Sequence, residues 1–248
     1  MVIVSIVKQV PAPEARLRLH DGMPDFEGVT FVLDGMDEYG VEQALRVRED
    51  GTDAELVVLG YGPEGGDHVV RTALAMGLDR GVYLEHEAWD DPLAVAMALG
   101  DVVREAGAKL VFVGGKQSDW DSAAVGPALA EVLGWAHVTW ATAFTLRGES
   151  FEAVHDVDEG SERVQGELPV VVTTQQGLND PRYPTLPSIM KARRKPLDVR
   201  QADASEGAVR VRTYLPLELD RRRIVLQGDV RTAAQELVRR LRDEAKVL

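Results

Sequence analysis

A glycine-rich run, 114–118, follows a predicted buried strand and leads into a predicted helix over residues 122–133. In open α/β sheets, ligands bind beyond the carboxyl ends of strands, and the free N–H groups at a helix start attract anions. The methyl side chains of Ala123 and Ala124 would leave those groups accessible. The spacing therefore indicates a phosphate site, although a tight turn before a capped helix has the same residue types. The turn 60–63 and the loop 34–36 could form neighbouring walls.

The sequence contains none of the common catalytic patterns. It has no triphosphate-binding loop of the Walker type, no Gly-x-Ser-x-Gly turn and no His-Glu-x-x-His helix. Its five histidines are scattered, and the lack of cysteine excludes disulfides, thiolate metal sites and cysteine nucleophiles. Asp119 and Asp121 could bind a metal or act as a base, but the helix dipole already favours acids at a helix start. We therefore predict no metal site and no catalytic residue.

Charge divides the chain into two parts. The formal net charge is −13, yet residues 191–248 carry 15 Lys or Arg against 9 Asp or Glu. The rest of the chain is strongly acidic, which argues against nucleic acid as a partner because phosphate backbones require clustered basic groups. The basic end could bind the acidic body, an acidic partner or an anionic ligand, or could form a solvated face.

No apolar run approaches the ~20 residues of a membrane-spanning helix. Residues 1–7 also lack the basic or Arg/Ser-rich leader of a targeting signal. We therefore expect a cytoplasmic protein that is not itself a membrane protein.

Strand and helix patterns alternate through the first half of the chain. Predicted strands 2–7, 55–59, 81–85 and 109–113 are followed by predicted helices 37–48, 63–76, 92–106 and 122–133. This alternation predicts an α/β fold with a mostly parallel, doubly wound sheet of the adenine-nucleotide-binding type.

The pattern changes after residue 135. Shorter strands at 138–146, 151–155 and 162–167 predict an antiparallel addition, followed by a buried strand at 168–174. The segment 177–190 holds three prolines and predicts a functional loop, and residues 196–228 look irregular. Asp229 caps a final amphipathic helix that carries an apolar stripe up to Leu248. We therefore predict a nucleotide-binding domain over 1–190, and an arm and helix over 191–248.

Several segments, in their order and spacing, resemble the β subunit of electron transfer flavoprotein from one end of the chain to the other. They are 7–10, 71–77, 79–81, 115–117, 156–173, 178–183 and 189–192. The resemblance implies a heterodimer with an α subunit that carries most of the FAD site. It also implies electron transfer from acyl-CoA and related dehydrogenases of fatty acid β-oxidation to a membrane quinone oxidoreductase.

The resemblance further implies a structural AMP in this chain. The phosphate would lie at the helix start, beside Asp121 and Ser122, and walls around the nucleoside would come from the strand ends and nearby loops. The implied cofactor-binding residues are Ile6, Asp34, Met36, Tyr61, Gln117, Asp121, Ser122, Ala123, Ala124, Val125 and Gly126.

Two departures keep a second cofactor open. AMP-binding members carry Asn-Gln-Thr where this chain has Ala123-Ala124-Val125, and the run 119–127 resembles electron-bifurcating members that hold a second FAD. A third departure lies at the flavin edge, where the aromatics of the family are replaced here by Pro13 and Met36.

The segment 177–192 resembles the family's partner-recognition loop, with Leu186 as the apolar anchor entering a dehydrogenase pocket. The basic run 191–195 could steer acidic partners, and the arm and helix of 191–248 would dock on the α subunit. The recognition residues are Tyr183, Thr185, Leu186, Pro187, Ile189, Met190 and Lys191. An alternative from another class is a free-standing adenine-nucleotide-binding enzyme or a stress-type ATP-binding protein, against which the missing triphosphate loop counts.

Overall fold

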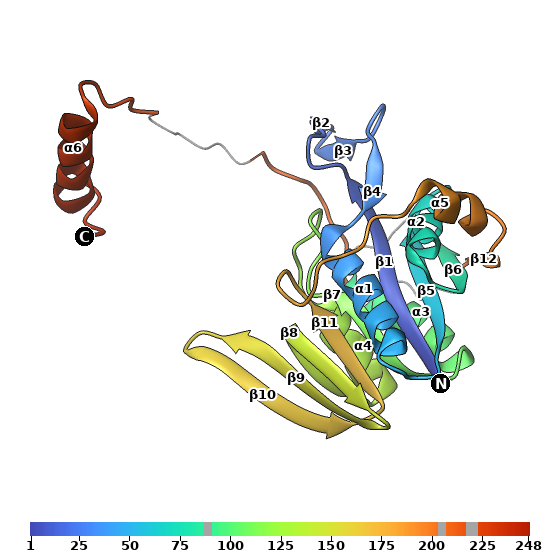
Figure 1. Cartoon of the computed structure of the whole chain (residues 1–248). Coiled ribbons are helices and arrows are strands. Elements are labelled where there is room, and N and C mark those ends of the chain that lie inside the picture. The colour runs from blue at the N-terminus through green and yellow to red at the C-terminus, as the bar shows by residue number, and fades with distance from the viewer. Residues whose placement is uncertain (87–90, 203–206, 217–222) are drawn as a thin grey trace. The chain divides into compact units, whose positions relative to one another are not determined.

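The computed structural model describes residues 1–86, 91–202, 207–216 and 223–248 (Figure 1). These form two compact units, Met1–Thr213 and Tyr214–Leu248. The predicted division between residues 190 and 191 falls inside a helix of the first unit. Residues beyond that helix remain with the first unit because one further strand joins its sheet and the Asp91 carboxylate accepts the amides of Ala208 and Val209.

The first unit is built on one large sheet with the strand order β10-β9-β8-β11-β7-β1-β5-β6-β12, and β4 pairs with β1. All neighbours from β8 to β12 along this order are parallel, whereas β9, β10 and β4 pair antiparallel. The parallel strands are β1 Val2–Pro11, β5 Glu55–Gly62, β6 Arg80–Glu85, β7 Ala108–Gly114, β8 Ala136–Arg147, β11 Val170–Thr174 and β12 Leu197–Gln201. This confirms the predicted fold class.

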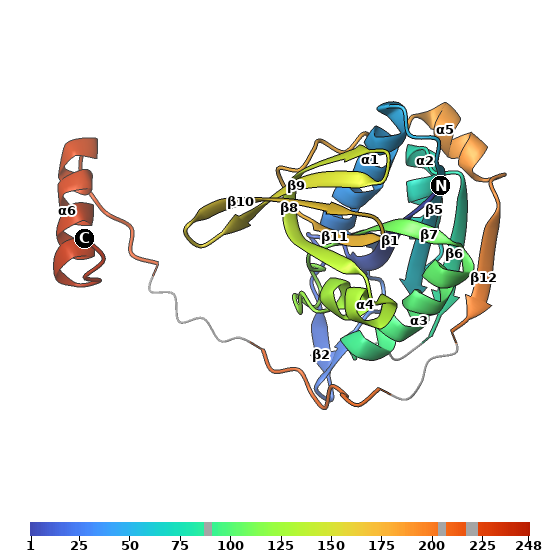
Figure 2. The same cartoon turned by 90° about the horizontal axis from the view of Figure 1, so that it is seen from below.

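Helices cover both faces of the sheet (Figure 2). Along β1, Ile3 and Val7 pack into the core shared with α1 and α2, while Val4 and Ile6 face the core shared with α3 and α4. This alternation follows the two-residue period of a strand. Burial on both faces explains why these strands read as continuous apolar runs. The helices are α1 Gly35–Glu49, α2 His68–Met76, α3 Pro92–Glu105 and α4 Val125–Leu133.

The antiparallel addition forms one end of the sheet. β8 continues through β9 Ser150–Val157 and β10 Gly160–Glu167, and the edge-to-face contact of Phe112 with Phe144 joins this addition to the core under α1. Between β1 and α1 the chain forms a separate hairpin, β2 Arg18–His20 with β3 Met23–Asp25, and then β4 Phe31–Leu33. The sequence patterns did not predict these three short strands.

Four local predictions are corrected by the structure. The helix expected from Pro63 begins at His68, and the helix expected from Ser122 begins at Val125. The proline-rich segment contains the helix α5 Leu186–Ala192 because Thr185 accepts the amide of Ser188 as an N-cap and Pro187 lies in the first turn, where proline loses no hydrogen bond. The stretch expected to be irregular contributes β12, which pairs with β6.

The second unit contains α6 Val230–Asp243, which begins at the predicted cap, Asp229, but ends before Ala245 and Leu248. Val230, Leu237 and Val238 are exposed on this helix, and no described residue of α6 is buried. None of the helices described here is both long enough and apolar enough to span a membrane.

Candidate functional site

The sheet reverses its winding at β1, because the chain proceeds from β1 through α1 to β5 on one side and returns after β6 to place β7 on the other. Ser5 of β1 pairs with Val58 of β5 and with Phe112 of β7. Ligand sites of doubly wound sheets lie at such a reversal, beyond the carboxyl ends of the strands. The chain segments that meet at these ends are therefore the candidate site.

Two aspartates at the start of α1 tie the strand ends together. Asp34 caps the helix by accepting the amide of Met36 at 2.8 Å, and its second oxygen accepts the amide of Ser118 at 2.8 Å. Asp37 accepts the amides of Lys8 at 2.8 Å and Gly114 at 3.0 Å. The Gln117 side chain also donates to Asp37, at 3.3 Å. Of the predicted walls, Asp34, Met36 and Gln117 are thus brought together.

Sequence reasoning missed Asp37, which reads as an ordinary first-turn acid. Complete burial, followed by the charge of Asp34, raises the pKa of Asp37 well above its ordinary value, although three N–H donors oppose this shift. Burial, with the charges of Asp37, Asp119 and Asp34, also raises the pKa of Tyr61. Tyr61 and Ile6 lie in the hydrophobic core on the α3 and α4 side. The site therefore has an acidic, largely buried floor.

The loop between β7 and α4 carries two ion pairs and a cation–π contact. Lys8 lies 2.7 Å from Asp119, with its ammonium 5.5 Å from the centre of the Trp120 ring, and Lys116 lies 2.5 Å from Asp121. Lys8 and Lys116 are therefore already paired with loop carboxylates. At the start of α4, the donors that remain for a ligand are main-chain N–H groups. Trp120 is a second feature that spacing did not indicate.

The predicted phosphate residues divide into a strained loop and a helix start. Asp121 and Ala123 have φ angles of 53° and 52°, a left-handed conformation that is costly without glycine and clusters at binding sites. The first turn of α4 contains Val125 and Gly126, whose amides are among the first N–H groups of the helix and therefore have no intrahelical acceptor. A Cβ at Gly126 would lie 2.2 Å from the Thr173 methyl group, so glycine lets the helix start pack onto β11.

A separate pocket of about 500 Å³ lies between the start of α1 and the segment after β11. Asp34 and Met36 contribute to one side of its lining, Pro13 comes from the loop after β1, and Tyr183 and Pro184 come from the proline-rich segment. The structure thus brings predicted cofactor-binding and partner-recognition residues to one pocket.

The predicted recognition residues are strongly exposed. Tyr183 is 93% exposed and Leu186 73%, and Ile189 and Met190 follow on α5. Thr185 and Pro187 form the start of the helix, and Lys191 is exposed near its end. Within the basic run 191–195, the Lys195 ammonium donates to the carbonyls of Leu74 and Leu78, and the steering role of the run stays a prediction. Burial lowers the pKa of Lys195.

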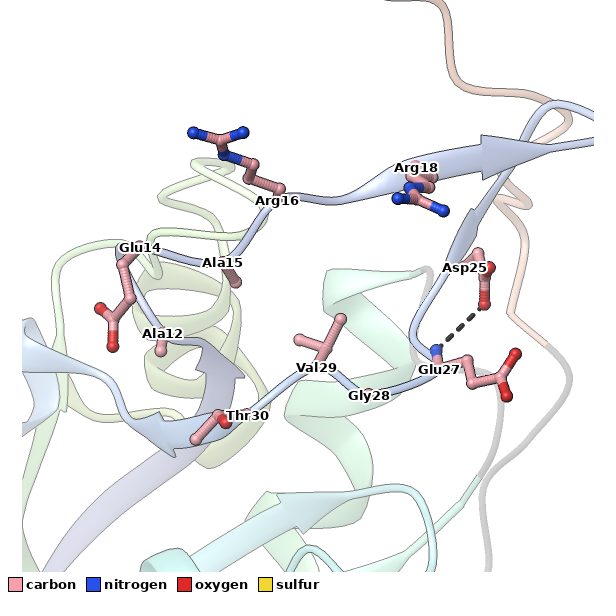
Figure 3. A pocket seen from close by; sticks show the side chains of 10 residues that line it. All are labelled: Ala12, Glu14, Ala15, Arg16, Arg18, Asp25, Glu27, Gly28, Val29 and Thr30. Atoms are coloured by element: carbon pink, nitrogen blue, oxygen red, sulfur yellow. Dashed lines mark hydrogen bonds between the residues drawn. The ribbon is translucent and has the colours of Figure 1, made fainter.

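A further pocket of about 440 Å³ lies beside the β2–β3 hairpin and includes no predicted site residue. Its charges have both signs, and Figure 3 shows Glu14, Arg16 and Glu27 pointing in different directions. Asp25 accepts the amide of Glu27 at 3.0 Å, which stabilises the local turn. The pocket therefore lacks convergent groups for one ligand. No group of three or more metal-ligating side chains occurs in the part of the chain that the structure describes.

Comparisons with known proteins give a consistent result. Residues 26–205 match the family model described as electron transfer flavoprotein domain. The chain is 35% identical over its full length to the complete electron transfer flavoprotein subunit beta of Bradyrhizobium diazoefficiens, and 33% identical to that of Bacillus subtilis with full coverage of both chains. It is 36% identical to the Bos taurus protein of the same name over 71% of each chain.

Proposed function

Because this chain belongs to the β-subunit family of electron transfer flavoproteins, we propose that it is the supporting subunit of a heterodimeric electron carrier. An α subunit would hold most of the FAD, and the complex would accept electrons from acyl-CoA and related dehydrogenases of fatty acid β-oxidation. The complex would lie in the cytoplasm and would deliver these electrons to a membrane quinone oxidoreductase. FAD, when bound, supplies the electron-carrying group, and the residues of this chain bind the cofactor and position the partner proteins.

The observation that carries this proposal is the pocket shared by Pro13, Met36 and Tyr183. By the resemblance, Pro13 and Met36 stand where the family carries aromatics along the flavin edge, and Tyr183 begins the exposed recognition segment. A donor protein bound at Leu186 would therefore lie close to the flavin edge, as short-range electron transfer requires. The shared pocket supports a role in which one face of this chain serves both cofactor and donor.

We further propose that the start of α4 holds the phosphate of a structural AMP. The amides of Val125 and Gly126 supply donors, and a helix N-terminus favours an anion. Because Lys8 and Lys116 are already paired with carboxylates, main-chain groups rather than lysine side chains would bind the phosphate. Asp121, Ser122, Ala123 and Ala124 would border the phosphate, with Gln117, Asp34 and Met36 toward the nucleoside and Ile6 and Tyr61 beneath.

A second FAD is the competing occupant of this site. The small side chains of Ala123 and Ala124 remove groups that would otherwise contact a terminal phosphate, so the loop does not select a monophosphate by side-chain contacts. A diphosphate could use the same amides. This alternative would make the chain a subunit of the electron-bifurcating type.

A nucleotide census tests both proposals. The chain is co-expressed with its α subunit, the purified heterodimer is denatured, and released AMP and FAD are quantified by chromatography. One AMP and one FAD per heterodimer supports the structural-AMP proposal, whereas two FAD and no AMP supports the bifurcating alternative. ATP turnover by the isolated chain would favour the free-standing nucleotide enzyme and contradict the carrier role.

We propose that the arm and α6 dock on the α subunit. The apolar residues Val230, Leu237 and Val238 are exposed although α6 is strongly amphipathic. Such a face normally packs against another element. Its arginines would add charged contacts around that apolar stripe.

A further inference from the structure

The segment that precedes the exposed recognition residues is bound to α1 by several specific contacts. The Asn179 amide donates to the carbonyl of Tyr39 at 3.0 Å and to the Gln43 side chain at 3.1 Å. Arg182 then binds Glu42 and Glu49, which lie two turns apart on the same face of α1. The chain is therefore attached to a rigid helix immediately before Tyr183.

Arg182 donates from all three of its guanidinium nitrogens. Its guanidinium donates to both oxygens of Glu42, at 2.7 and 3.0 Å, and to both oxygens of Glu49, at 2.6 and 2.9 Å. Its main-chain amide adds a bond of 3.2 Å to Glu42. The Glu42 side chain is only 4% exposed. Two bidentate contacts fix the orientation of the arginine plane as well as its position.

The far end of the segment is attached to α2. Arg71 donates from one nitrogen to the carbonyls of Ala192 at 2.9 Å and Lys195 at 2.8 Å. In return, Lys195 donates to the carbonyls of Leu74 and Leu78 near the end of α2. Arg71 of α2 thus reaches the last residue of α5, and Lys195, three residues beyond α5, reaches the end of α2; both cations satisfy carbonyls near a helix end that lack a helical partner.

The exposed apolar residues of this segment lie between these two attachments. Tyr183, Leu186, Ile189 and Met190 follow Arg182 and precede Ala192, and Figure 1 shows α5 beside α2. They contribute little to the core, so their position depends on the attachments rather than on their own burial.

We infer that Arg182 and Arg71 are positioning residues that hold segment 183–191 as a preformed docking surface for the electron donor. This inference rests on the proposed function, because it assumes that a donor dehydrogenase binds there. A surface ordered before binding avoids the entropic cost of ordering it in the complex. Loss of one attachment should therefore weaken donor binding without changing the flavin environment.

The test uses the flavin-loaded heterodimer with Arg182→Lys and Arg182→Gln, and with Arg80→Lys as a matched control. Arg80 makes a similar two-nitrogen contact with Glu55 on another part of the first unit. Hydrogen–deuterium exchange is measured over 183–191, and electron transfer is measured with an acyl-CoA dehydrogenase reduced by its substrate. Glu49→Gln removes only the outer carboxylate and serves if the Arg182 variants do not assemble.

For Arg182→Gln we expect faster exchange confined to 183–191, an apparent KM for the dehydrogenase raised about tenfold, and an unchanged kcat and FAD content. Arg80→Lys should leave all four unchanged. Unchanged exchange and KM in the Arg182 variants, with electron transfer impaired by Leu186→Ala, would overturn the inference and leave the proposed function standing. If Leu186→Ala is also without effect, the proposed docking function of the segment itself is wrong.

Discussion

Asp37 and Gly114 lie 77 residues apart in sequence, and the Asp37 carboxylate accepts the Gly114 amide at 3.0 Å while also accepting the Lys8 amide. One side chain thus joins α1 to the ends of β1 and β7, the two strands between which the sheet reverses its winding. A Cβ at Gly114 would lie 2.4 Å from this carboxylate, so glycine is what permits so close an approach. The arrangement positions the floor of the candidate site by main-chain contacts.

This buried carboxyl group predicts a pH dependence of stability. Because burial raises the pKa of Asp37 in the folded chain, proton binding favours folding. That contribution is complete below the pKa of the unfolded chain and is lost as the pH rises through the folded-state pKa. Asp37→Asn cannot titrate, so the unfolding free energy of wild type minus that of the variant should fall as the pH rises from about 4 to 8.

Urea unfolding of the heterodimer at several pH values measures this difference. Asp101→Asn, at an exposed position paired with Arg104, is the control and should show no comparable trend. A difference that stays constant across the range would show that Asp37 keeps an ordinary pKa, with its N–H donors balancing the effect of burial.

Leu186→Ala should slow electron transfer from a dehydrogenase while the flavin content stays unchanged. Leu186 is 73% exposed, so its truncation should change the unfolding free energy by less than about 0.5 kcal/mol. Stopped-flow reduction of the heterodimer by a substrate-reduced dehydrogenase measures the rate. Leu93→Ala, at an exposed leucine of α3, is the control; equal rates for Leu186→Ala and wild type would exclude Leu186 as the anchor.

Ala124→Asp should separate nucleotide binding from helix stability. Ala124 occupies the N-cap of α4 without a side-chain bond, and a cap-forming side chain there adds about 1 kcal/mol of stability. The same carboxylate would repel a phosphate and compete for its amides. We therefore expect a stabler chain that copurifies with less nucleotide.

The control is Ala124→Asn, which has almost the same shape and caps the helix without a charge. Chromatographic quantification of nucleotide and thermal unfolding are compared for both variants. Retention of a full complement of nucleotide by Ala124→Asp would show that no phosphate lies at the start of α4.

Removal of residues 229–248 should weaken assembly with the α subunit, and so should Leu237→Glu, since a charge would then interrupt the apolar stripe of α6. Gln235→Glu places the same charge at an exposed polar position of that helix and should have little effect. Titration of the two subunits, monitored by calorimetry, measures the affinity. Affinity that survives the deletion would mean that α6 is not part of the interface.

The sequence alone predicted the layered architecture because burial on both faces leaves a direct record in the chain. Strands such as 109–113 are continuous apolar runs, and the helices between them carry polar faces at helical spacing. The family was also evident from the sequence, since many short motifs recur in order along the whole chain. The layered architecture and the family can be recognised from the types and order of residues along the chain, without knowing which elements pack together.

Tertiary contacts decided the features that local patterns could not predict. β12 forms because its backbone pairs with β6, and three prolines obscured α5, which is held between Arg182 and Arg71. Because Asp121 and Ala123 have left-handed backbone, α4 begins only at Val125. The predicted phosphate residues are therefore divided between the loop and the helix. Asp37 looked like a first-turn acid because its partners, Lys8 and Gly114, come from distant strands. Sequence periodicity records which face of an element is buried, whereas a site depends on which distant backbone groups that burial brings within hydrogen-bond distance.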